Sequence, residues 1–262
     1  MVTGGSLDAV VVTGAGRGIG KAVALSLGRS VVPVLCVSRT VNAEATRDAI
    51  RDAGGVADAL VVDLADISAT EIAVRAWIDS RPYARLGVVL AAGILGPAGP
   101  LRTTNLGDWA SAFSVNVLGG LAVVRALLDR MTMAGRGRIV FLAGGGAAYA
   151  YPLFPAYACT KAAVVRAAEN LHEDLKSKGD FAVVCLAPGA IDTDMLAAVR
   201  AAGAEVRTTV AVTDAVAAIV AFLGSASTAL SGRFVHVRDA WDAVLEGTVD
   251  LTPDHWKLRR VE

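Results

Sequence analysis

Seven short apolar runs recur along the chain, separated by longer segments in which apolar residues return at helical spacing. The runs are almost continuous in Val, Leu, Ile and Ala, which is typical of parallel strands covered on both faces. They span residues 8–13, 33–38, 57–63, 87–91, 137–143, 181–187 and 232–237. The segments of helical length span 18–28, 42–53, 68–80, 108–134, 156–178 and 212–223. This order predicts an α/β fold, a doubly wound parallel sheet of about seven strands with helices on both faces.

The end of the chain departs from this rhythm. No linker, repeat or change of composition divides the sequence, so we expect a single domain over residues 1–262. Residues 238–262 form a C-terminal tail that carries Trp241, Trp256, Arg259 and Arg260. We expect this tail to pack across the domain or against a neighbouring subunit.

Composition narrows the class of partner. The chain is 54% apolar, which excludes a disordered protein, and 25 basic residues balance 25 acidic ones. Zero net charge gives no reason to expect nucleic acid or an anionic membrane, so a small-molecule substrate is the expected partner. The apolar runs are shorter than the roughly 20 residues of a membrane span, and the first residues lack a signal-peptide pattern. We expect a cytoplasmic protein.

The cysteines and histidines give no sign of a metal site. Cys36, Cys159 and Cys185 lie in or beside apolar runs without pairing or ligand spacing. We therefore expect buried free thiols in a reducing compartment. The three histidines, His172, His236 and His255, are scattered along the chain.

Glycines follow the first predicted strand and lead directly into a helix. The segment from Thr13 reads TGAGRGIG, with Gly14, Gly18 and Gly20 at its key positions. Glycines let the backbone approach a pyrophosphate, and the helix N-terminus offers free N–H groups and a favourable dipole. The spacing differs from the longer GxGxxG fingerprint. A cofactor-binding turn is predicted, and a tight turn without a ligand is the alternative.

Tyr157 and Lys161 are four residues apart at the start of a predicted helix, and therefore lie on one face. A neighbouring ammonium stabilises a phenolate, so we expect Lys161 to lower the pKa of Tyr157 from about 10 toward neutral. The phenol can then exchange a proton with an alcohol oxygen while hydride passes to or from nicotinamide.

These two motifs together resemble the short-chain dehydrogenase/reductase family, in its single-domain branch with a Rossmann fold. Further features appear in the family's order: Asp63 with Leu64, Ala91 to Gly93, Asn116, and Pro188-Gly189 followed by Ile191 and Thr193. The resemblance extends to about residue 237. It implies an NAD(P)-dependent oxidoreductase that interconverts a secondary alcohol and a ketone. It also implies a homodimer or homotetramer formed through the helices around Asn116 and Tyr157.

The resemblance assigns roles to individual residues. Asn116, Tyr157 and Lys161 would be catalytic, with Asn116 holding a water that links Lys161 to solvent. The residues implied for the cofactor are Gly14, Arg17, Gly18, Ile19, Gly20, Ser38, Arg39, Asp63, Leu64, Ala91, Gly93, Tyr157, Lys161, Pro188, Gly189, Ile191 and Thr193.

The end of the second predicted strand favours NADP. An acidic residue there would bind the ribose hydroxyls of NAD, whereas this chain has Ser38, Arg39 and Thr40. A guanidinium grips phosphate oxygens in a fork, so Arg39 and Arg17 suit a 2′-phosphate. NAD remains the alternative if Arg39 is only a solvated residue after a strand.

One position departs from the family pattern. The family usually carries a serine thirteen residues before the tyrosine, and Gly144 stands there, followed by Gly145 and Gly146. Losing one donor to a developing oxyanion costs about 2.7–4 kcal/mol. Either Tyr149 or Tyr151 replaces the hydroxyl, the substrate brings its own, or the glycine N–H groups bind the oxygen. A regulatory or weakly active cofactor-binding protein is the other alternative.

Substrate contacts are expected from the loops at the carboxyl ends of the strands. We predict that Gly144, Gly145, Tyr149 and Tyr151 meet the substrate. Apolar walls are expected from Leu95, Leu101, Tyr149, Tyr151, Phe154, Met195 and Leu196. Asp192 and Asp194 are either solvated or touch a polar substrate. The chain between Gly189 and Thr213 is too short for a very large lid.

Overall fold

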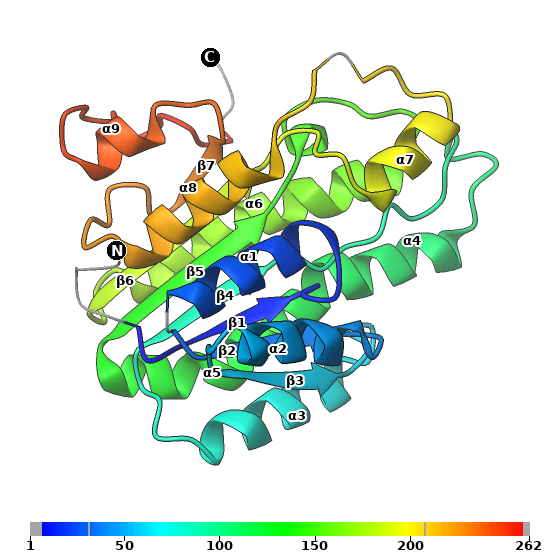
Figure 1. Cartoon of the computed structure of the whole chain (residues 1–262). Coiled ribbons are helices and arrows are strands. Elements are labelled where there is room, and N and C mark those ends of the chain that lie inside the picture. The colour runs from blue at the N-terminus through cyan, green and yellow to red at the C-terminus, as the bar shows by residue number, and fades with distance from the viewer. Residues whose placement is uncertain (1–6, 31, 207, 259–262) are drawn as a thin grey trace.

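A parallel sheet of seven strands, in the order β3-β2-β1-β4-β5-β6-β7, forms the centre of the computed structural model (Figure 1). The structure describes residues 7–30, 32–206 and 208–258. The strands are β1 (Ala9–Thr13), β2 (Val34–Ser38), β3 (Ala57–Val61), β4 (Leu86–Leu90), β5 (Arg136–Leu142), β6 (Asp180–Ala187) and β7 (Arg233–His236). Every neighbouring pair is parallel. The predicted doubly wound α/β sheet is confirmed.

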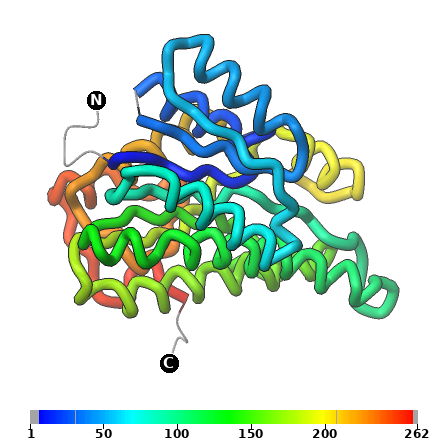
Figure 2. The backbone as a smooth tube through the Cα atoms, turned by 90° about the horizontal axis from the view of Figure 1, so that it is seen from below, coloured from blue at the N-terminus to red at the C-terminus, as the bar shows by residue number. Residues whose placement is uncertain are grey.

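Helices cover both faces of this sheet. They are α1 (Gly18–Arg29), α2 (Asn42–Asp52), α3 (Ile67–Asp79), α4 (Leu106–Phe113), α5 (Gly120–Ala134), α6 (Pro155–Leu175), α7 (Asp194–Ala201), α8 (Val212–Gly224) and α9 (Trp241–Leu245). A π-helical segment, Ser114–Gly119, joins α4 to α5, and a short 3₁₀ helix, Gly145–Ala147, follows β5. Figure 2 shows α1 and α2 on one side of the sheet and α5 and α6 on the other.

Side chains that alternate along each strand feed two separate cores. In β1, Val11 joins the core beneath α3, α5 and α6, whereas Val10 and Val12 join the core beneath α1 and α8. All five β1 residues are buried. The apolar run of β1 is therefore continuous because neither face of this strand meets water.

The crevice between β1 and β4 is where the strand order reverses. Parallel sheets of this kind bind ligands there, outside the carboxyl ends of the strands. The backbone N–H of Ala92 donates to Thr13 Oγ1 over 3.1 Å and holds the two loops together. A Cβ on Gly14, whose φ is +68°, would lie 2.8 Å from Ala92 N, so a side chain there would collide with backbone.

Several boundaries differ from those predicted. Strand β3 ends at Val61 rather than residue 63, and the Asp63 carboxylate accepts a hydrogen bond from Ala65 N over 3.0 Å in the turn that follows. The predicted helix 108–134 begins at Leu106, where Asn105 caps α4. Helices α7 and α9 were not predicted. Both are short, with 8 and 5 residues.

The helical stretch Leu106–Ala134 corrects the expectation that no segment is long enough for a membrane span. Its 29 residues have an 18-residue window of mean hydropathy 1.7, half of it buried. Within this stretch, Val123, Leu127 and Met131 of α5 are fully buried in the protein core. The apolar character is that of a helix packed inside a folded domain.

The described part of the C-terminal tail packs on its own domain. Phe234 N, in β7, donates to Trp256 O over 2.7 Å, and Arg166 of α6 donates to Leu258 O over 3.0 Å. Trp241 and Trp256 pack against the core beneath α1 and α8. Arg259 and Arg260 lie outside the described residues.

Two of the three cysteines are buried as expected. Burial raises the pKa of both Cys36 and Cys185 to about 12. The prediction is wrong for Cys159, which is exposed on α6.

Candidate active site

A cavity of about 530 Å³ opens at the carboxyl end of the sheet and gathers many of the predicted residues. Those lining it are Ile19, Ala91, Gly93, Gly144, Gly145, Tyr149, Tyr151, Tyr157, Lys161, Pro188, Gly189, Ile191 and Thr193. Leu95, Met195 and Leu196 supply apolar wall, as expected. Leu101 does not line the cavity, since 62% of it is exposed, and Phe154 is buried behind the wall.

Tyr157 and Lys161 lie one turn apart on α6, which begins with Pro155 in its first turn. Lys161 Nζ is 5.3 Å from the centroid of the Tyr157 ring. The ammonium donates a hydrogen bond to Leu142 O over 2.7 Å, at the end of β5. Phenol and ammonium are therefore neighbours beneath the same cavity.

Burial sets the protonation of this pair. It raises the pKa of Tyr157 to about 12, and the nearby Tyr151 phenol acts in the same direction. Burial also lowers the pKa of Lys161 to about 8. The expectation that Lys161 brings the phenol pKa toward neutral is wrong for this structure, because burial raises that pKa and Lys161 is not among the groups that shift it. Tyr157 is consequently a protonated donor at neutral pH.

Asn116 lies in the π-helical segment, beneath the cavity rather than in its wall. Its Oδ1 accepts from Ile94 N over 2.8 Å, and its Nδ2 donates to Ile94 O and to Thr160 Oγ1, each over 2.9 Å. Thr160 Oγ1 donates in turn to Tyr157 O over 2.7 Å. Asn116 thus links the loop after β4 to the first turn of α6. π-Helical turns are frequent at functional sites.

Gly93 lies between Asn116 and Lys161 at the cavity. A Cβ at this position would lie 3.4 Å from Asn116 Oδ1 and 3.7 Å from Lys161 Nζ. A larger side chain would therefore enter the space between the loop after β4 and Lys161.

The glycine loop leaves the N-terminus of α1 open. Gly18 has a φ of +55°, and a Cβ on Gly20 would lie 2.4 Å from Gly14 O. In the described chain no side chain caps α1, whereas Asp66 caps α3 and Thr193 caps α7. An uncapped helix N-terminus with positive dipole suits an anion such as a phosphate.

The residues predicted for the far end of the cofactor lie along the same edge of the sheet, outside the cavity. Ser38 Oγ donates to Thr40 O over 2.6 Å and shapes the turn after β2, while Arg39 is exposed. Leu64 is buried. Asp63 is exposed in the turn that follows β3.

Arg17 has a protein partner. Its Nη1 lies 3.0 Å from Asp194 Oδ2, so the ion pair joins the glycine loop to α7, and both side chains are largely exposed. Asp192 pairs with Arg200 in the same way, over 3.2 Å. Exposed pairs of this kind contribute about 0–1 kcal/mol.

Gly144 stands directly beside the Tyr157 hydroxyl. A Cβ there would lie 3.5 Å from Tyr157 Oη, which is ordinary contact. The φ of Gly144 is 178°, an extended backbone open to any residue. Nothing in the local structure requires glycine at this position.

Sequence reasoning missed one wall of the cavity, formed by Glu205, Val206, Thr208, Val210, His236 and Arg238. His236 ends β7, and its Nδ1 accepts from Arg238 N over 3.1 Å. A signal was present, because β7 was predicted and side chains just after a parallel strand face this edge. The Val210 N–H donates a hydrogen bond to Ala190 O over 2.8 Å, which holds Val210 at the cavity wall.

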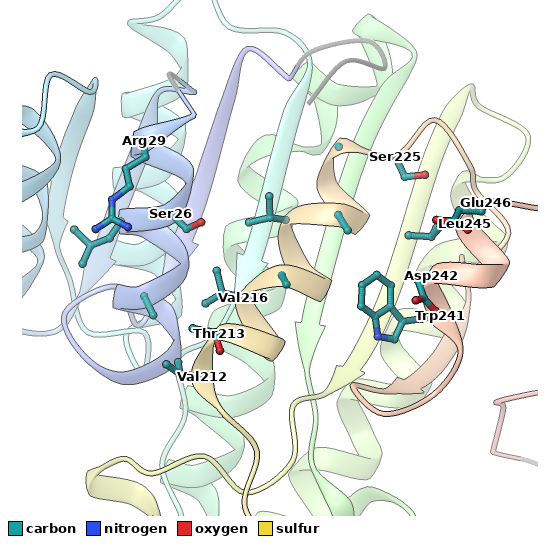
Figure 3. Close-up of a pocket in the computed structure, with 16 residues that line it drawn as sticks. Ser26, Arg29, Val212, Thr213, Val216, Ser225, Trp241, Asp242, Leu245 and Glu246 are labelled. Atoms are coloured by element: carbon teal, nitrogen blue, oxygen red, sulfur yellow. The ribbon is translucent and has the colours of Figure 1, made fainter. Parts of the chain in front are cut away.

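A second cavity, of about 870 Å³, lies between α1, α8 and α9 (Figure 3). Figure 3 shows Trp241 extending from α9 toward α8, opposite Ser26 and Arg29 of α1. None of the predicted catalytic or cofactor residues lines it. The chemistry is therefore concentrated in the cavity around Tyr157.

The family model described as short chain dehydrogenase matches residues 8–204. A curated relative from Arabidopsis thaliana, an NADPH-dependent aldehyde reductase-like protein, is 32% identical over 199 residues, covering 71% of this chain and 73% of that protein. A 3-oxoacyl-[acyl-carrier-protein] reductase from Aggregatibacter actinomycetemcomitans is 33% identical over 193 residues, covering 72% of this chain and 78% of the relative.

Solved structures give the same picture. A Beutenbergia cavernae protein assigned as an NAD(P) dependent gluconate 5-dehydrogenase, with bound NADP, matches with a TM-score of 0.82 and 31% identity, covering 90% of this chain and 96% of that one. A gluconate 5-dehydrogenase from Burkholderia cenocepacia, in complex with NADP and tartrate, matches with a TM-score of 0.78 and 26% identity, covering 87% and 92%.

Proposed function

Because this chain belongs to the short chain dehydrogenase family of NAD(P)-dependent oxidoreductases, we propose that it interconverts a secondary alcohol and a ketone with NADP as cofactor. The observation that carries the proposal is the Tyr157–Lys161 pair, in which a partly buried phenol and a buried ammonium line a cavity that begins at the glycine loop. The cofactor would supply or accept the hydride. The protein would supply the proton and the binding site.

The residues present fit such a cofactor. The uncapped N-terminus of α1 would hold the pyrophosphate, since Gly18 and Gly20 keep side chains away from it. Asp63 and Leu64 would border the adenine, and Pro188, Gly189, Ile191 and Thr193 would border the nicotinamide. Ile19, Ala91 and Gly93 lie between these ends, in the cavity wall.

The preference for NADP rests on the turn after β2. Ser38 and Arg39 stand there without an acidic neighbour, and the exposed Arg39 guanidinium is available to a 2′-phosphate. The relatives whose names specify NADPH or NADP agree with this preference. Arg17 pairs with Asp194, but this exposed pair is weak, so Arg17 would remain a second ligand of the 2′-phosphate beside Arg39.

Tyr157 and Lys161 act together on the substrate oxygen. Tyr157 carries its proton at neutral pH and donates it to the substrate oxygen as that oxygen gains charge. The Lys161 ammonium, fixed by Leu142 O, stabilises the phenolate that results. Asn116 holds the loop after β4 and the first turn of α6 in register and, with a water, would connect Lys161 to solvent.

The glycine at position 144 leaves the Tyr157 side of the pocket without a serine hydroxyl. Tyr149 or Tyr151, a hydroxyl of the substrate, or the N–H groups of Gly144 and Gly145 would compensate. The competing function, a cofactor-binding regulatory protein with weak turnover, predicts that none of them does.

The test is NADPH oxidation with a panel of ketones, aldehydes, 3-oxoacyl thioesters and oxo-sugar acids, run with wild type and Tyr157→Phe. Turnover that Tyr157→Phe lowers at least a hundredfold, with NADPH binding retained, supports the oxidoreductase. If the variant matches wild type, Tyr157 is not the proton donor. Tight NADPH binding without turnover on any substrate would favour the regulatory alternative.

The expected form of the enzyme is a cytoplasmic homodimer or homotetramer. Leu118 in the π-helical segment is 47% exposed and Met133 near the end of α5 is 85% exposed, and exposed apolar side chains of this kind support burial of these helices by another copy. Light scattering of the purified protein measures the oligomeric state.

A further inference from the structure

The cavity presents one obvious donor to a reacting carbonyl oxygen, and that oxygen has two lone pairs. Tyr157 serves one of them under the proposed function. A second donor that faces the growing negative charge lowers the barrier, and removing such a donor typically costs about a hundred- to a thousandfold in rate. A second hydroxyl beside Tyr157 would therefore speed the reaction.

Most hydroxyls in the described cavity wall are unsuited to donate to the substrate oxygen, because they already form hydrogen bonds within the protein or are exposed to water. Thr193 Oγ1 donates to Ile191 O over 3.1 Å and accepts from Leu196 N as the cap of α7. Thr208 Oγ1 accepts from Arg238 over 3.4 Å on the wall near β7. Tyr149 is 79% exposed, and a solvated phenol loses most of its advantage as a donor.

Tyr151 lines the same cavity as Tyr157. Both rings are partly buried and pack against one apolar cluster, which contains Leu196 and the buried Phe154. The Tyr151 ring centroid is 5.5 Å from that of Phe154, and the Tyr151 carbonyl accepts from Phe154 N over 3.0 Å. These contacts hold Tyr151 just before the start of α6 and on the wall that Tyr157 shares.

The two phenols also interact electrostatically. The Tyr151 phenol raises the pKa of Tyr157, and burial raises the pKa of Tyr151 itself. Ionisation of either ring is thus unfavourable while the other is nearby. Both hydroxyls are protonated at neutral pH and can donate together to one oxygen.

We propose that Tyr151 is a catalytic residue that donates the second hydrogen bond to the reacting oxygen of the substrate. The inference rests on the proposed oxidoreductase function. Tyr157 transfers its proton to that oxygen, whereas Tyr151 keeps its own proton and stabilises the charge. The substrate class this favours is a ketone whose oxygen is reached by two phenols from one side of an apolar pocket.

The first test replaces single tyrosines by phenylalanine. Tyr151→Phe keeps the ring against Phe154 and removes only the hydroxyl, so we expect kcat to fall about a hundredfold with unchanged NADPH affinity and melting temperature. Tyr83→Phe, which removes a phenol hydroxyl beside Trp77 and outside the cavity, is the matched control and should stay within about twofold of wild type. A Tyr151→Phe enzyme with wild-type kcat would overturn the proposal.

The second test restores a hydroxyl from the opposite side. Gly144 has an extended backbone, and a Cβ there lies 3.5 Å from Tyr157 Oη, so Gly144→Ser places a donor beside the same oxygen. In the Tyr151→Phe background, Gly144→Ser should recover at least tenfold in kcat, and Gly144→Ala should recover nothing. Equal recovery by alanine, or none by serine, contradicts a shared hydrogen-bonding role.

The outcomes distinguish failure of the Tyr151 role from failure of the proposed oxidoreductase function. If wild type turns over, Tyr157→Phe abolishes turnover and Tyr151→Phe does not reduce it, only the role of Tyr151 is refuted. If wild type oxidises NADPH with no substrate of the panel, the oxidoreductase function fails and the role of Tyr151 fails with it.

Discussion

Lys161 Nζ donates a 2.7 Å hydrogen bond to the carbonyl oxygen of Leu142, so the buried ammonium is tied to the last residue of β5. The 3₁₀ helix of glycines begins only three residues further on. The ammonium beside Tyr157 is therefore held by the sheet itself. Its cost appears as the lowered pKa of Lys161.

That lowered pKa predicts a pH-dependent difference in stability. Native Lys161 releases its proton near pH 8, whereas the unfolded side chain keeps it to about 10.5, so the unfolded state binds more protons between these values. The free energy of unfolding of wild type, relative to Lys161→Met, should therefore rise by about 2 kcal/mol from about pH 7 to about pH 9.5. Urea denaturation at the two pH values measures it. A difference that falls with pH would show that the native lysine holds its proton more tightly than the unfolded one.

Asn116→Ala should destabilise the protein and impair catalysis together. The substitution removes three hydrogen bonds, to Ile94 N, Ile94 O and Thr160, of which the last is buried, at a net of about 1 kcal/mol each. We expect the free energy of unfolding to fall by about 2–4 kcal/mol and kcat to fall with little change in NADPH affinity. Asn105→Ala, which removes the exposed cap of α4, is the control, at about 1 kcal/mol. Similar losses for both variants would contradict a special role for the buried amide.

Arg39→Ala should weaken NADPH selectively. A charge-assisted hydrogen bond contributes about 1.5–3 kcal/mol, so the KM for NADPH should rise roughly tenfold or more while kcat and the KM for NADH stay near wild type. Steady-state kinetics with both cofactors make the comparison. Arg29→Ala is a charge-matched control, because Arg29 is the last residue of α1, at the end away from the glycine loop. We expect it to change the KM of neither cofactor. An equal rise in the KM for NADH would show that Arg39 does not act through the 2′-phosphate.

Gly20 and Gly145 should differ sharply in how well they tolerate substitution by alanine. A Cβ at Gly20 would lie 2.4 Å from Gly14 O, whereas one at Gly145 meets nothing within 4 Å. We expect Gly20→Ala to lower the free energy of unfolding by more than about 2 kcal/mol, because backbone must move, and Gly145→Ala to stay within about 0.5 kcal/mol. Thermal and urea denaturation measure both. A stable Gly20→Ala protein would show that the loop can relax.

The sheet was predictable because its strands are buried on both faces, which makes each run continuous. The pattern could not show helix α7 or α9, since helices of 8 and 5 residues owe their stability to packing more than to periodicity. The π-helical turn at Asn116 adds one residue per turn without a sequence signal. It became visible only with the hydrogen bonds of the folded chain.

The candidate site was predictable where chain order brings residues together. Spacing alone placed Tyr157 and Lys161 on one face of α6. It could not give the degree of burial, and burial is what raises one pKa and lowers the other. His236 and Arg238 were missed because their approach to the cavity depends on where β7 ends.

The extended backbone of Gly144 has an evolutionary consequence. The loop at Gly14 and Gly20 admits no side chain without backbone movement, so it constrains what sequence drift can reach. Position 144 imposes no such limit, and a single substitution can add or delete a polar group next to the Tyr157 hydroxyl. Catalytic chemistry in this chain can therefore be revised by mutation independently of the architecture that holds the cofactor.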